Sequence, residues 1–81
     1  MRQSMIYMQG MATQTGLSLS RIEAAMGDIM VIQARIDAGQ DVRGWGSFKN
    51  GQMSMLESLG AGHYTIINCF EALIDERKEN A

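Results

Sequence analysis

The segment from Ser20 to Ala38 constrains the fold most, because it predicts a single helix with apolar side chains on two opposite faces. Ser20 and Glu23 have the spacing of a capping box, and Gly39 is typical of the residue just after a helix. With successive residues about 100° apart, the larger apolar side chains share one face: Ile22, Ala25, Met26, Ile29, Ile32 and Ile36. The opposite face, here called the small-residue face, consists of Ala24, Gly27, Val31, Ala34 and Ala38. A helix that is apolar on two sides is usually buried on both.

The small-residue face is therefore the predicted oligomer interface. A chain of 81 residues buries only about 60 to 65% of its unfolded surface, so a monomer is expected to be marginally stable. Cys69 is the only cysteine, which excludes a disulfide within the chain, and one cysteine with one histidine does not suffice for a closed zinc site. Self-association or a protein partner is left as the way to complete the core. The alternative is a solvated face of good helix formers, which Gly27 and Val31 fit poorly because both lower helix propensity.

The rest of the chain is expected to be helical too, because it has no proline and no long alternation of apolar and polar residues. The first segment has one apolar stripe, which consists of Met1, Met5, Met8 and Ala12. Gly16 is expected to end this helix. The last segment keeps seven apolar residues in one helical phase: Trp45, Phe48, Leu56, Leu59, Ile66, Phe70 and Ile74. This phase predicts that "WGSF" is the first turn of the last helix, after a turn at 39–41 with Asp41 as candidate N-cap. The alternative is a loop in which Ser47 caps the following helix.

Two expected breaks complete the architecture. Gly16 and Ala61, the latter inside "GAG", lie at similar distances along the chain from the turn at 39–41. The helical segments before and after this turn are therefore expected to bend at similar distances from it. The predicted fold is all-α: one domain, residues 1–81, forming a bent antiparallel helical hairpin of three to four helices. We expect this hairpin to pack into a homo-oligomeric bundle.

No catalytic or metal-binding pattern stands out in the sequence. His63 shares the apolar stripe with Leu59 and Ile67, and the same face offers neither an orienting acid nor a nucleophile. A core histidine, or one paired across a dimer axis, is therefore favoured over a general base or metal ligand. Cys69 has no basic neighbour in sequence and is predicted to be a packing residue on the face of Thr65 and Ala72. We expect no enzymatic activity, no metal and no cofactor.

Arg43, Trp45, Phe48 and Lys49 form the one basic and aromatic cluster in the chain. Two interpretations remain open for it. The aromatic rings can pin the end of the hairpin as buried anchors. They can instead stack a base or another flat ligand while the two cations hold a phosphate.

Charge and length then set the expected function. A net charge of −2 is unlike the basic surface of a nucleic-acid binder, and no apolar run is long enough to span a membrane. Because polar residues also interrupt any signal core, the expected location is cytoplasmic. The leading hypothesis is a non-enzymatic helical interaction protein, an adaptor, regulatory subunit or inhibitor that binds itself and a larger protein. Small helical proteins of this class are common on phages and mobile elements. The alternative is an oligomeric small-ligand or nucleotide-binding protein that uses the 43–49 cluster.

Overall fold

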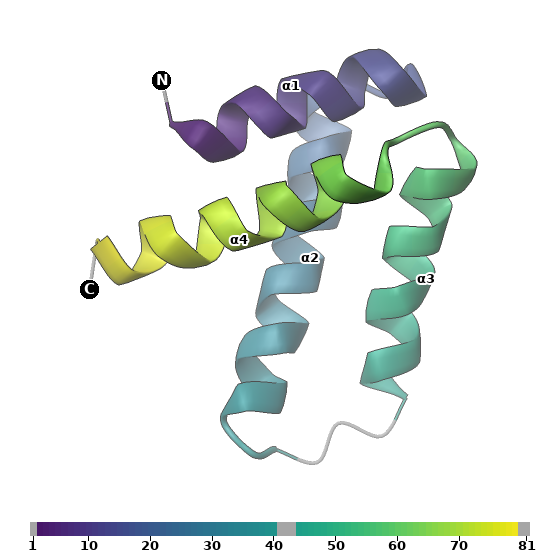
Figure 1. Ribbon diagram of the computed structural model, residues 1–81. Helices are drawn as coiled ribbons and strands as arrows, with labels where there is room; N and C mark the ends of the chain where they lie inside the picture. The colour runs from purple at the N-terminus through teal and green to yellow at the C-terminus, as the bar shows by residue number, and fades with distance from the viewer. Residues whose placement is uncertain (1, 41–43, 80–81) are drawn as a thin grey trace.

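The computed structural model describes residues 2–40 and 44–79, without the side chains of 45–48. Within these ranges the chain forms four α-helices and no strand: α1 (Gln3–Thr15), α2 (Leu19–Asp37), α3 (Trp45–Ser58) and α4 (His63–Glu79). The predicted all-α fold is confirmed for this part of the chain. Figure 1 shows α2 and α3 side by side with opposite directions, and α1 and α4 as a second antiparallel pair that crosses α2. The most extensive packing is between α1 and α4, so the two ends of the described chain are held together.

The break after α1 follows from a glycine and a serine. Gly16 takes the left-handed conformation with φ 75°, and its N–H donates to the Ala12 carbonyl. Ser18 is then extended, and its side chain accepts a hydrogen bond from the Arg21 N–H, so that α2 begins at Leu19. The predicted capping box at Ser20 is therefore wrong, because Ser20 already lies inside the helix. The end of α2 agrees with the sequence, since Gly39 has φ 74°.

The link between α3 and α4 lies tightly against the end of α1. Gly60 has φ 113°, and a Cβ atom there would come 2.7 Å from the carbonyl oxygen of Gln14. Two residues later the Gly62 N–H donates to Gln14 Oε1 over 3.0 Å. The expected kink in "GAG" is confirmed, and close backbone approach explains why glycine is needed there.

The helix expected at "WGSF" is also present. Gly44, with φ 84°, immediately precedes α3, which begins at Trp45. Asp41 and Arg43 lie outside the described residues. The expectation of one apolar phase from Trp45 to Ile74 is wrong at Leu59, which is 44% exposed. The physical reason is that α3 ends at Ser58, so that Leu59 belongs to a turn and no longer follows the helix.

The core lies where α1 and α4 cross α2. Its completely buried side chains come from all four helices: Met11, Ile22, Met26, Ile29, Leu56, Ile66 and Cys69. The larger apolar face predicted for α2 is thus confirmed as the buried one. The stripe predicted for α1 is partly wrong, because Met8 is buried as expected but the other buried positions are Ser4 and Met11.

Candidate protein-interaction surface

An apolar groove runs along the surface where α1, α2 and α4 meet. It consists of two adjoining pockets that share Met8 and Leu73. The first, of about 300 Å³, is lined by Met8, Glu23, Met26, Gly27, Met30, Val31, Leu73 and Arg77. The second, of about 360 Å³, is lined by Arg2, Ser4, Met5, Met8, Leu73 and Glu76. We call the two together the methionine groove.

Helix α2 forms one wall of the first pocket, and its sequence explains why the wall is open. Gly27 has no side chain, and a Cβ atom built there would meet nothing within 4 Å. Val31, one turn further along, is 47% exposed. Met26 and Met30 also line the pocket, although both are almost completely buried. Methionine side chains are flexible and polarisable, which suits a surface that must adapt to a partner.

Two opposite charges border the same pocket from different helices. Glu23 stands on α2 and Arg77 on α4, and both are exposed. Among the residues that the structure describes, neither side chain has a hydrogen bond or an ion pair, with each other or with a third group. In the second pocket, by contrast, the Glu76 carboxylate already accepts hydrogen bonds from Ser4.

The predicted oligomer interface coincides in part with this groove. All five residues of the small-residue face (Ala24, Gly27, Val31, Ala34 and Ala38) are exposed; the first four lie on α2, and Ala38 is its C-cap. Gly27 and Val31 line the groove, Ala24 lies one turn before Gly27, and Ala34 and Ala38 follow Val31 toward the end of the helix. The small-residue face and the methionine groove therefore form one continuous surface.

The 43–49 cluster is described only at Lys49. Arg43 and the side chains of Trp45 and Phe48 lie outside the described part, so neither interpretation of the rings is tested. Lys49 Nζ donates to Gln33 Oε1 over 2.7 Å and lies 5.3 Å from the centroid of the Phe70 ring. Lys49 thus connects α3 to α2 and α4.

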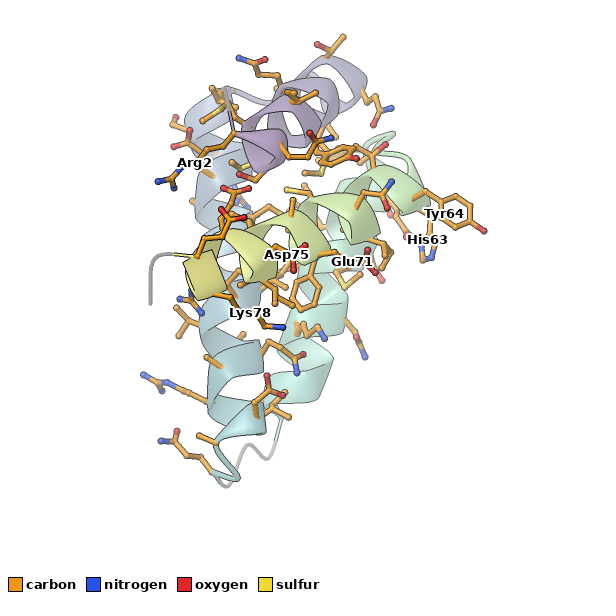
Figure 2. The ribbon with its side chains drawn as sticks, turned by 60° about the vertical axis from the view of Figure 1, so that its left-hand side comes forward. Arg2, His63, Tyr64, Glu71, Asp75 and Lys78 are labelled. Carbon is orange, nitrogen blue, oxygen red and sulfur yellow. The ribbon has the colours of Figure 1, made fainter. Side chains whose placement is uncertain are left out.

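His63 is exposed, so the prediction of a core histidine is wrong. Its Nδ1 lies 2.7 Å from Glu57 Oε1, and the histidine side chain is 62% exposed. Figure 2 shows His63 and Tyr64 projecting away from the helices at the corner between α3 and α4. Because the phase of α3 is lost at the turn, α4 starts with His63 outside the core. Glu57 is the acid that the sequence argument did not find, since it lies across that turn.

Cys69 is buried between α1 and α4, as a packing residue should be. Its Sγ lies 3.8 Å from the Ser4 carbonyl oxygen. Burial, followed by the nearby charge of Glu76, raises the pKa of the Cys69 thiol to about 12. The packing role is confirmed, but the expected face is wrong, because Cys69 lies on the core face with Ile66.

A second, polar hollow of about 450 Å³ lies between α1 and α4. Its α4 side carries three carboxylates spaced one helical turn apart: Glu71, Asp75 and Glu79. Figure 2 shows Glu71 and Asp75 along the outer side of α4, with Arg2 beyond them at the start of α1. Sequence reasoning did not single out this hollow, because it depends on the packing of two helices from opposite ends of the chain.

Two further observations apply to the residues that the structure describes. They contain no group of three or more His, Cys, Asp and Glu side chains arranged to hold a metal ion. None of their helices combines the length and the apolar character needed to cross a membrane. In comparisons with known proteins, no family model matches the chain, and neither a curated protein nor a solved structure matches it.

Proposed function

We propose that this chain is a non-enzymatic interaction protein, which binds a larger protein as an adaptor, regulatory subunit or inhibitor. The observation that carries the proposal is the methionine groove, continuous with the small-residue face of α2. Methionine and arginine are enriched at the centres of protein interfaces. Here Met8, Met26 and Met30 border an open pocket whose edge carries Arg77.

The same surface supports self-association into a helical bundle. Gly27 and the alanines of α2 place only small side chains, or none, on the exposed side of the helix, so a second helix can approach its backbone closely. Val31 is a β-branched residue held 47% exposed on that side. Burying an exposed valine on association is favourable, since a fully buried valine contributes about 1.5–3 kcal/mol relative to an exposed one.

Val31→Asp tests the proposal against a matched control, Ile6→Asp. Both positions lie inside helices and are exposed to nearly the same extent, 47% for Val31 and 49% for Ile6. Only Val31 lines the groove. We expect Val31→Asp to abolish capture of a larger protein, because association would then bury a carboxylate. Ile6→Asp should leave capture intact.

Circular dichroism should show that both variants keep the helical content of the wild type. The captured protein is identified by mass spectrometry, and its affinity for the wild type and both variants is then measured with the purified components. Equal loss of affinity in both variants, or none in Val31→Asp, would refute the groove as the functional surface.

A further inference from the structure

The first pocket of the methionine groove is arranged for self-complementary contact. A two-fold interface brings residue i of one copy to residue j of the other, and j of the first to i of the second. A surface that carries an acid and a base beside apolar residues can satisfy this rule, because the acid of each copy can pair with the base of the other. Glu23 on α2 and Arg77 on α4 line the first pocket together with the apolar Met26, Met30 and Leu73.

We propose that a second copy of this chain occupies the methionine groove, in a two-fold dimer where Glu23 of each copy pairs with Arg77 of the other. The inference rests on the proposed function and names one partner for its surface. It also accounts for two exposed charges that have no partner among the described residues.

The charges also select the orientation of the two copies. If the two-fold axis brings Glu23 of one copy opposite Arg77 of the other, both Glu23–Arg77 contacts are attractive. If the axis instead brings each residue opposite its own equivalent, Glu23 approaches Glu23 and Arg77 approaches Arg77. Like charges placed opposite each other at an interface are strongly unfavourable. The charges therefore favour the dimer in which Glu23 of one copy lies opposite Arg77 of the other.

Gly27 makes this approach sterically possible. A Cβ atom at Gly27 would meet nothing within 4 Å in the single chain, so the space above it is open to a neighbour. A leucine there should leave the single chain folded and fill the space that the second copy would take. Gly27→Leu is therefore expected to weaken the dimer.

Reversed charges provide the decisive experiment. In Glu23→Arg two arginines face each other at both contacts, and in Arg77→Glu two glutamates do. We expect each single variant to raise the dimer dissociation constant at least about tenfold. An equimolar mixture of the two variants should recover the wild-type constant, because both contacts in the mixed dimer join opposite charges. The double variant Glu23→Arg/Arg77→Glu should recover it as well.

Sedimentation equilibrium with differently tagged chains measures all these constants. The matched controls are Asp28→Arg and Lys78→Glu, which make the same change of charge on α2 and α4 at exposed positions outside the groove. Both controls should dimerise like the wild type.

Three results would overturn the proposal: a wild-type protein that stays monomeric, single variants that dimerise normally, or a mixture that fails to recover. If any of these occurs while Val31→Asp still abolishes capture of a larger protein, the groove binds a different protein and the proposed function stands.

Discussion

Glu76 should be the most sensitive charged position in the chain, because it takes the place of a cap for α1. The side chain of Arg2, the residue before α1, makes no capping hydrogen bond. Instead the Ser4 N–H donates to Glu76 Oε2 over 3.1 Å, and the Ser4 Oγ donates to Oε1 over 2.7 Å. Ser4 is 3% exposed and the Glu76 side chain 15%, so water is largely excluded from both. A carboxylate from α4 thus accepts a backbone hydrogen bond at the start of α1 in place of a capping side chain.

The size of the effect of Glu76→Gln follows from these two contacts. Glutamine keeps one acceptor oxygen but turns an NH₂ group toward one of the two donors, so one hydrogen bond is lost. A hydrogen bond to a charged group contributes about 1.5–3 kcal/mol, and a negative charge at a helix N-terminus about 0.3–1 kcal/mol. Because some solvent still reaches the carboxylate, we expect the free energy of unfolding to fall by about 2 kcal/mol. For a domain of this size the melting temperature would fall by about 10 °C.

Urea denaturation followed by circular dichroism measures this difference. Glu79→Gln is the matched control: it is exposed, has no partner among the described residues and should change stability by less than about 0.5 kcal/mol. Combining Glu76→Gln with Ser4→Ala in a double-mutant cycle should reveal coupling between the two sites. A Glu76→Gln variant as stable as the Glu79→Gln control would refute the assigned cap.

Four further substitutions test separate parts of the fold by the same denaturation assay. Gly60→Ala should destabilise the protein by more than about 1 kcal/mol, because φ is 113° and the new methyl group would meet the Gln14 carbonyl. Gly10→Ala, where nothing lies within 4 Å, should stabilise α1 by about 0.5–1 kcal/mol. Cys69→Ala should flatten the dependence of stability on alkaline pH. The folded thiol has a pKa of about 12 against an ordinary 9.0, so its contribution is complete below pH 9.0 and is lost as the pH rises toward 12. His63→Asp should lower the free energy of unfolding by less than about 1 kcal/mol, since the pair with Glu57 is exposed. A loss of several kcal/mol would instead indicate that His63 is buried in the core.

Local signals in the sequence predicted the helices and their breaks well. Gly16 and Gly39 take the left-handed conformation that a helix end requires, and each is recognisable from its place after an apolar periodic segment. The larger apolar face of α2 can be predicted because one uninterrupted helix preserves its phase over 19 residues. Both successes depend only on residues close together in the chain.

The incorrect predictions arise where the helical phase is extended across a turn between two helices, or where residues in contact are distant in sequence. Leu59 and His63 flank the turn between α3 and α4, so the helical phase that placed them in the core does not apply. The contacts of Glu76 with Ser4 span 72 residues, and that of Gly62 with Gln14 spans 48. No periodicity links such positions. The groove cannot be predicted for the same reason, although the sequence places Gly27 and Val31 on one face of α2.

The structure also changes the physical argument for association. The solvent-accessible surface is 4967 Å², close to the roughly 4,800 Å² of a monomeric protein of this length. Buried residues from all four helices already form one core, so a partner is not required to complete it. The exposed small-residue face and the methionine groove are therefore additional to the core. Exposed apolar surface beside charges that have no partner among the described residues does not stabilise the single chain, and this is why we assign it to binding.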